Sequence, residues 1–263
     1  MSLPIKPQPD CASAWRAAVA AVDQQPSDSA YNVLIDIADP LAGAGIGDPR
    51  VAVVDAFLQP YGKSVETVAN TIFPAALYYR HGAPAFFTAF RDRVLPKVRK
   101  NARWSGYYFE RMMQVPAVGG GMINQLWDIV ERMKDPAVKA NNKFELSLFD
   151  PERDVDDSPY GGQCLSFLSF KLLPGAPKTL TLTAMYRNHF YIEKLLGNLI
   201  GLGRLMEFVA EEAGLKVGTL TILSTHAEID KPKSKQLGQV SRAQIDQMLA
   251  AFDQAIAKPA LAA

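Results

Sequence analysis

The chain has 263 residues, of which 48% are hydrophobic, and its formal net charge is only +1. This length permits one large domain or two small ones, and the composition supplies enough apolar material for a buried core. A nearly neutral chain has no overall positive field for a polyanion, so nucleic-acid binding is disfavoured as its main activity. A small anionic ligand needs only a few local cations and is compatible with this charge.

Two cysteines, Cys11 and Cys164, do not make a disulfide framework in a chain of this length, which favours a reducing cytoplasm. The N-terminus shows no signal-peptide pattern. No uncharged apolar run approaches the roughly 18 residues that a membrane span needs. We therefore expect a cytoplasmic protein without membrane attachment.

In chain order, the first half predicts a Pro-rich N-terminal arm and then a short helix over 12–24. Residues 32–39 and 50–58 are predicted as two strands, or as a strand and a turn, separated by a Gly-rich segment. Its "GAGIG" (43–47) lacks both the GxGxxG spacing and the lysine of a phosphate loop, which favours a turn. Further helices are predicted over 64–82, with a break at Pro74, over 83–100, and over the amphipathic segment 122–135.

The second half predicts strands over 143–150, 165–172, 179–186 and 218–229. A mostly apolar helix is predicted over 191–213, and a final helix over 241–257 with Ser241 as its N-cap. Strands and helices mix without a regular βαβ alternation, which favours the α+β class. We expect an N-terminal arm with a short helix over 1–30 and a single domain over 31–263.

Three functional groups lie at the ends of neighbouring predicted elements. Cys164 precedes a strand and is either a small buried side chain or a nucleophile whose pKa a nearby cation lowers. Arg187 ends the next strand. It is either an exposed charge or a planar guanidinium that binds an oxyanion or a phosphate. Asn198 lies inside an apolar helix, where its amide needs hydrogen bonds from the protein or from a ligand.

Other polar residues offer weaker patterns. His226, Glu228 and Asp230 alternate at the end of a strand, but no second His or Cys lies nearby, so we expect no metal site. His81 and His189 have no evident partners in the sequence. The cluster "RWSGYYFER" (103–111) sets aromatic rings beside charges, as the edge of a core or the lining of a pocket.

From Cys164 to Ile229 the chain resembles the catalytic half of the thymidylate synthase and pyrimidine hydroxymethylase family. The segments that carry the resemblance occur in the family's order: "CLSFLSFKL", "MYRNHF", "LGNLI", "GLKVG" and "HAEID". From Arg187 onward the match needs no gap, and the clear match covers about a quarter of the chain. The resemblance implies a mixed β-sheet packed with helices.

The resemblance also implies roles for single residues. Cys164 falls on the nucleophile that adds to C6 of the pyrimidine, Arg187 on a phosphate-binding arginine, and Asn198 on the asparagine that reads the O4/N3 edge of uracil. Tyr108 falls on the active-site tyrosine. Glu66 falls on the glutamate that takes part in proton transfer at the ring's O4.

The family forms a homodimer with shared active sites, and the resemblance implies the same here. A pair of arginines in the family binds the phosphate in the partner's site. The pair falls on Asn142 and Lys143, so Lys143, or alternatively Lys139, would take this role.

The chain departs from the family at several contacts. Asn188 replaces the serine after the arginine, and Phe190 replaces the aspartate that orients folate. Glu228 and Asp230 replace the His and Tyr that hold the sugar hydroxyl, so a different sugar is conceivable. The family's C-terminal tail is not recognisable in 255–263.

The function implied is that of a transferase in nucleotide biosynthesis. It would move a methyl or hydroxymethyl group from 5,10-methylenetetrahydrofolate to C5 of a pyrimidine nucleotide. The alternative is a non-catalytic nucleotide-binding homologue that has lost folate chemistry.

Overall fold

The computed structural model describes residues 2–99, 106–155 and 162–257. Its main feature is one mixed sheet that contains both parallel and antiparallel strand pairs, confirming the α+β class. The strand order is β1 (Leu3–Pro4), β2 (Ser29–Ile37), β9 (Lys216–Glu228), β7 (Thr179–Tyr186), β6 (Leu165–Leu173) and β5 (Phe144–Ser147), with the short β8 (His189–Phe190) also paired to β9. β9 runs parallel to β7 and antiparallel to β2.

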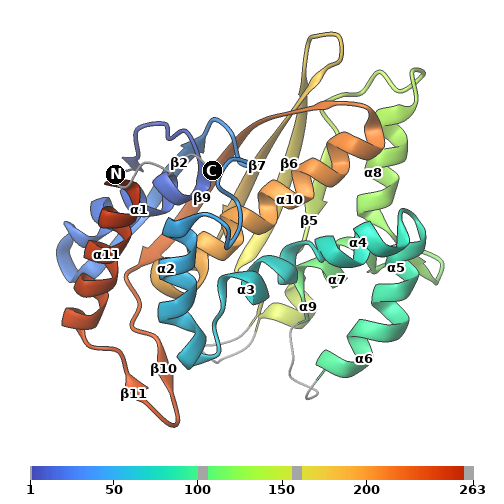
Figure 1. The fold of residues 1–263 in the computed structure, drawn as a ribbon. Coiled ribbons are helices and arrows are strands. Elements are labelled where there is room, and N and C mark those ends of the chain that lie inside the picture. The colour runs from blue at the N-terminus through green and yellow to red at the C-terminus, as the bar shows by residue number, and fades with distance from the viewer. Residues whose placement is uncertain (1, 100–105, 156–161, 258–263) are drawn as a thin grey trace.

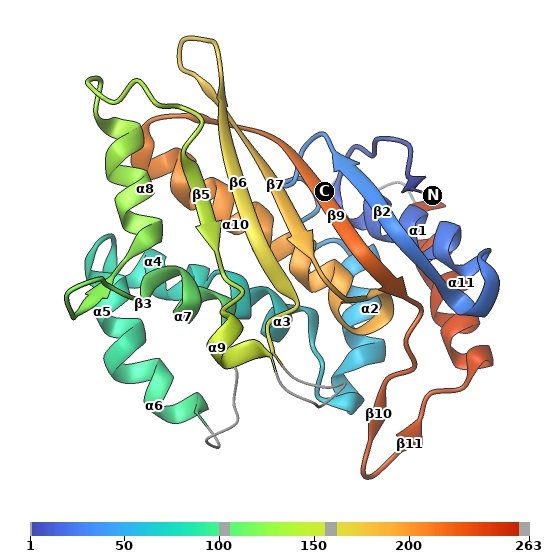
Figure 2. The ribbon, with the colours of Figure 1, turned by 180° about the vertical axis from the view of Figure 1, so that it is seen from behind.

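Helices cover one face of this sheet. Figure 1 views the molecule from the helical side, and Figure 2 shows the opposite face, which none of the described helices crosses. Side chains alternate accordingly, so that in β7 Leu180, Leu182 and Ala184 are buried while Thr183 is exposed. The helices are α1 (Cys11–Asp23), α2 (Pro49–Leu58), α3 (Val65–Ile72), α4 (Ala75–His81), α5 (Ala85–Ala89), α6 (Leu95–Val98), α7 (Tyr108–Met113), α8 (Gln125–Lys134), α9 (Pro151–Asp154), α10 (Leu196–Ala213) and α11 (Arg242–Ala257).

Two glycines let α3 approach α10 closely. A Cβ added at Gly197 would come within 2.6 Å of the Val68 side chain. One added at Gly201 would come within 2.8 Å of the backbone oxygen of Ala69. The two glycines are four residues apart and therefore share one face of the helix. This close contact holds α10, which carries Asn198, firmly within the helical layer.

Most of the predicted elements are confirmed. The break at Pro74 separates α3 from α4, and the pattern over 83–100 forms α5, a π-helical turn (Phe90–Val94) and α6. The apolar segment 191–213 begins as a π-helical turn, η4 (Tyr191–Leu195), before α10. Ser241 caps α11 as predicted, since its Oγ accepts from Gln244 N at 3.3 Å and its own N–H donates to the Gln244 side chain.

The strand predicted over 50–58 is wrong, because these residues form α2. Its valines are typical of strands, but two local signals favour a helix. Asp48 caps the first turn by accepting from Arg50 N at 2.8 Å, and Pro49 occupies the first helical position. Val51, Val54 and Leu58 then follow helical spacing and are all buried.

The segment predicted as a Pro-rich N-terminal arm is packed against the rest of the chain. β1 pairs in parallel with β2, and Cys11 begins α1 fully buried. Its thiol donates to Pro40 O at 3.3 Å, and burial raises the pKa of the Cys11 thiol strongly. Cys11 is therefore part of the core.

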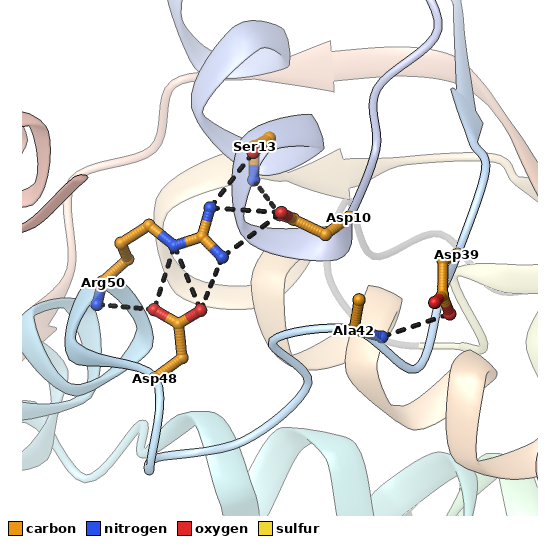
Figure 3. A network of polar contacts seen from close by, with 6 residues as sticks. All are labelled: Asp10, Ser13, Asp39, Ala42, Asp48 and Arg50. Atoms are coloured by element: carbon orange, nitrogen blue, oxygen red, sulfur yellow. Dashed lines mark hydrogen bonds and ion pairs between the residues drawn. The ribbon is translucent and has the colours of Figure 1, made fainter. Parts of the chain in front are cut away.

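A polar network ties the starts of α1 and α2 together (Figure 3). The Arg50 guanidinium donates to Asp48 at its own helix start and to Asp10 and Ser13 at the start of α1. Asp10 in turn caps α1 by accepting from Ser13 N at 2.7 Å. The segment 43–47, predicted as a turn, leads into this network, and Gly43 packs directly against it.

Candidate functional site

Cys164 and Arg187 lie side by side at one end of the sheet. The antiparallel pairing of β6 with β7 sets Leu165 opposite Tyr186, so the residues flanking that pair meet. Arg187 N donates to Cys164 O at 2.9 Å, and Arg187 Nε donates to Gln163 O at 3.0 Å. The guanidinium is exposed and is held against the segment that carries the thiol.

The Cys164 thiol is partly buried, and this burial is the largest influence on its pKa. Burial raises the pKa of Cys164 above its ordinary value. The positive charges of Arg187 and Lys194 act in the opposite direction, and the negative charge of Asp154 adds to the increase. A cation was expected to lower this pKa, but desolvation outweighs the two cations that are present.

Two tyrosines lie close to Cys164. The rings of Tyr108 and Tyr186 meet edge to face at 6.4 Å. Burial and the charge of Cys164 raise the pKa of Tyr108, and hydrogen bonds from the backbone of Leu165 and Cys164 oppose this rise. The structure thus places Tyr108 beside Cys164. The hydroxyl of Tyr186 is buried and has no hydrogen-bond partner among the described residues.

Asn198 is buried in α10 and is bonded to a histidine. Its Nδ2 donates to His189 Nε2 at 2.9 Å, and His189 Nδ1 lies 3.0 Å from Ser224 Oγ. His189 thus has two buried partners, although none was evident in the sequence. Ser224 comes from β9, which lies next to β8, so only the strand pairing could have revealed this contact.

The other residues predicted to bind the substrate are divided between several environments. Asn188 accepts from His226 Nδ1 at 2.6 Å. Asp230 accepts from Ile192 N at 2.8 Å and therefore caps the start of η4. Burial raises the pKa of Asp230 to about 7, although backbone hydrogen bonds oppose this. Glu228 is partly buried in β9 and is paired with Phe190 of β8.

Glu66 is held in a different set of contacts. It forms two bonds with Arg204, at 2.9 and 2.7 Å, and accepts from Asn70 at 3.1 Å. The Arg204 guanidinium lowers the pKa of Glu66. Among the contacts of the described residues, none joins Glu66 to Cys164.

Lys143 is exposed and lies away from Cys164 within the same chain. It directly precedes β5, where Phe144 pairs with Phe170 of β6. Phe170 is six residues beyond Cys164, or roughly 20 Å along the strand. Any role of Lys143 at a phosphate would therefore serve another copy of the chain.

The sequence reasoning missed Lys194 and a buried ion pair. Lys194 is partly buried, close enough to Cys164 to act on the thiol, and burial followed by the charge of Lys63 lowers its pKa. It precedes Asn198 by four residues, a spacing that could have signalled a shared helix face. Behind the cysteine segment, Arg111 pairs with Asp154 at 2.6 Å, both almost completely buried.

Within the described ranges, no group of three or more His, Cys, Asp or Glu side chains is placed to hold a metal ion. None of the helices in this part of the chain has the length and apolar character that a bilayer crossing requires.

Comparison with known proteins gives partial matches. No family model matches the chain. It is 34% identical over 108 residues to a protein of Methanopyrus kandleri named "Putative thymidylate synthase", covering 41% of this chain and 48% of that protein. Proteins of the same name from Methanosarcina barkeri and Methanococcoides burtonii are 36% and 30% identical over 110 and 111 residues, each covering 41% of this chain and 47% of the relative. The chain spans about half the length of the curated relatives it matches. These matches support a divergent thymidylate synthase-like relationship.

Proposed function

We propose that this chain is a thymidylate synthase-like transferase that acts at C5 of a pyrimidine nucleotide. The observation that supports the proposal is the contact of Cys164 with the exposed Arg187 where β6 begins and β7 ends. The buried amide of Asn198 in α10 is connected to this end of the sheet through His189, which stacks on Tyr186. The names of the archaeal relatives support the same chemistry and a role in nucleotide biosynthesis.

The charges at this site suit a nucleotide monophosphate. Arg187 offers a planar guanidinium for the phosphate oxygens, and Lys194 is a second cation close enough to act on Cys164. Asn198 lies deeper and offers an amide to the edge of the base. Glu228, at the end of β9, and Asp230 are proposed to contact the sugar, and Asn188 is proposed to contact the nucleotide beside Arg187.

The proposed reaction begins with the attack of Cys164 sulfur on C6. The thiol proton passes to water, an S–C6 bond forms, and the C5–C6 π electrons move toward O4, where hydrogen bonds to Asn198 stabilise the charge. C5 becomes nucleophilic and takes a proton from water. Loss of the original C5 hydrogen to water and departure of the thiolate then restore the ring, so exchange at C5 needs no other reactant.

The one-carbon donor expected from the resemblance is methylenetetrahydrofolate. Phe190 stands at the position of the aspartate that orients folate, and a phenyl ring cannot accept hydrogen bonds from a pterin. The described residues therefore do not fit this donor at that contact. We derive no step through it, and transfer of a methyl or hydroxymethyl group stays a proposal.

The test is release of tritium from C5-labelled dUMP, UMP, dCMP and CMP, with and without methylenetetrahydrofolate. We expect release from at least one nucleotide, and its loss in Cys164→Ala. Cys11→Ala is the matched control, because Cys11 is the other free thiol and lies in the core. Absence of release from every nucleotide would overturn the enzyme proposal. Full activity of Cys164→Ala would overturn the nucleophile.

Arg187→Ala tests the phosphate contact separately. A charge-assisted hydrogen bond contributes roughly 1.5–3 kcal/mol, so nucleotide affinity should fall about 10- to 150-fold. Calorimetric titration of the monophosphate and of the corresponding nucleoside separates this contact from base binding. The nucleoside should bind equally well to both proteins.

The second candidate is a non-catalytic nucleotide-binding homologue. The raised pKa of Cys164 and the apolar Phe190 both favour it. It predicts nucleotide binding in calorimetry without tritium release under any condition. The two candidates therefore differ in a single pair of measurements on the wild-type protein.

We also propose that the chain forms a homodimer through the uncovered face of the sheet. Four apolar side chains, each paired with the next across neighbouring strands, form a row on this face: Phe167, Met185, Leu223 and Leu34. All four are partly exposed in the single chain. Such a row is better covered than left in water. A partner would also be needed for Lys143 to reach an active site.

A further inference from the structure

His189 is a buried histidine that the proposed reaction does not use directly. It is 2% exposed, and its ring stacks on Tyr186 with centroids 3.9 Å apart and an angle of 12° between the planes. The ring of Tyr191 meets it edge-on at 5.6 Å. The imidazole is therefore held in one orientation, with Nδ1 toward Ser224 and Nε2 toward Asn198.

The hydrogen positions in this chain of contacts follow from the atoms that meet. The nitrogen of an amide carries hydrogens and no available lone pair, so Asn198 Nδ2 donates and His189 Nε2 accepts. A neutral imidazole then carries its hydrogen on Nδ1 and donates it to Ser224 Oγ. The hydroxyl of Tyr191 donates to the same oxygen at 3.3 Å, so Ser224 accepts two hydrogen bonds.

The imidazole stays neutral because it is buried. Burial lowers the pKa of His189 to about 3, and no carboxylate of the described residues is among its hydrogen-bond partners. A charged ring would carry hydrogens on both nitrogens and would turn one of them against the Asn198 amide hydrogens. The neutral form with Nδ1–H is thus the form that matches both partners.

This arrangement leaves the Asn198 amide with a defined polarity. One Nδ2 hydrogen is used by His189, and Oδ1 with the second Nδ2 hydrogen form an adjacent acceptor and donor. Uracil presents an N3–H donor beside the O4 acceptor, which is complementary to this pair. Cytosine presents an N3 acceptor beside an N4 amine, which is complementary only to an amide rotated by 180°. That rotation would turn Oδ1 toward the lone pair of His189 Nε2.

We propose that His189, oriented by Ser224 and Tyr191, is a positioning residue that sets the Asn198 amide to select uracil over cytosine nucleotides. The inference rests on the proposed function, because it takes Asn198 as the group that contacts the base. It adds the residue that decides which of the two bases is accepted.

The first test needs no ligand. The chain has three histidines, so the ¹⁵N spectrum of histidine-labelled protein is simple, and His189→Gln assigns the signals of His189. We expect a neutral ring with its hydrogen on Nδ1 from pH 5 to pH 8. A hydrogen on Nε2, or titration of the ring within that range, would overturn the proposal.

The second test compares dUMP with dCMP by calorimetric titration. The wild type should prefer dUMP, and His189→Gln should reduce that preference by about 10-fold or more, because a glutamine amide can present either a donor or an acceptor to Asn198. Ser224→Ala keeps the ring but removes the acceptor for Nδ1–H, and it should reduce the preference in the same direction. His81→Gln, in α4, is the matched control and should leave the ratio unchanged.

The outcomes separate this inference from the proposed function. A wild type that binds neither nucleotide overturns both. A wild type that prefers dCMP overturns the assigned amide orientation. Preference for dUMP that survives in His189→Gln and Ser224→Ala, with both variants folded by circular dichroism, overturns the role of His189 alone. A loss of preference in both variants supports it.

Discussion

At Cys164, burial and charge act on the same thiol in opposite directions. Burial raises the pKa, while Arg187 and Lys194 lower it, and burial has the larger effect. A bound phosphate would partly neutralise the same two cations. The rate at which Cys164 is alkylated in the free protein therefore reports how far the two cations lower the pKa of its thiol.

Removal of either cation should slow the alkylation of Cys164. In a Cys11→Ala background, Arg187→Ala and Lys194→Met should each lower the rate with iodoacetamide at pH 8 by about 3- to 10-fold, because the fraction of thiolate falls. Lys171→Met, near the opposite end of β6, is the control. Faster alkylation in the two test variants would mean that these side chains chiefly block access to the sulfur.

Asp230 should make stability depend on pH in a distinctive direction. Its pKa rises from an ordinary 3.8 to about 7 in the folded chain, so between these values the folded state binds more protons than the unfolded state. Its contribution to stability is complete below pH 3.8 and is lost as the pH rises through 7. Asp230→Asn keeps an acceptor for Ile192 N and removes the titration.

The difference in free energy of unfolding between Asp230→Asn and the wild type should therefore change by about 2–4 kcal/mol in favour of the variant as the pH rises from 4 to 8. Urea unfolding at pH 4, 6 and 8 measures this difference. His189 contributes in the opposite direction, since its lowered pKa gives stability that is lost as the pH falls below 6.5. A constant difference between the two proteins at all three pH values would contradict the assignment to Asp230.

At the scale of elements, helix ends determine where neighbouring elements meet. α1 and α2 each begin at an aspartate cap, and Arg50 joins the two caps (Figure 3). α3 and α10 meet instead through glycines that admit the opposite backbone. Asp230 caps η4 and thereby ties the end of β9 to the helix that carries Asn198.

Arg50→Ala should destabilise the fold by about 1–3 kcal/mol, because it leaves the partly buried carboxylates of Asp10 and Asp48 close together without their shared cation. Thermal or urea unfolding measures the change. Arg91→Ala is the matched control, since the pair of Arg91 with Asp92 is exposed and should matter little. Equal effects of the two substitutions would show that the network around Arg50 adds no stability.

At the scale of the molecule, the helices cover one face of the sheet and leave the other open. The open face carries polar threonines together with the apolar row of Phe167, Met185, Leu223 and Leu34. Cys164 and Lys143 lie near opposite ends of paired strands, so one chain does not bring them together. Both features agree with association through this face.

Charges in the apolar row should therefore separate the proposed dimer. Met185→Lys combined with Leu223→Lys should halve the mass measured by light scattering, because two lysines on each copy would face each other across the interface. Tyr79→Lys, an exposed position on α4 on the helical side, should leave the mass unchanged. A monomeric wild type at micromolar concentration would contradict the proposal.

Much of the fold was predictable because its signals are local. The strands around 165–172 and 179–186 follow from alternation and an intervening turn, and α8 follows from helical spacing. The prediction was wrong at α2. Its valines suggested a strand, whereas the cap at Asp48 and Pro49 at the first helical position favour a helix. The meeting of Cys164 with Arg187 was predictable in the same local way, since both flank one strand hairpin.

The sequence by itself determined the class of fold, most of its elements and the pairing of the thiol with a guanidinium, because these depend on neighbours within about one hairpin. Only the tertiary structure decided the partners of Glu66 and His189. Glu66 pairs with Arg204, 138 residues away, and His189 bonds to Ser224 across two strands. It also decided that the Cys164 pKa is raised, since desolvation depends on everything packed around a group, and most of that packing comes from distant parts of the chain.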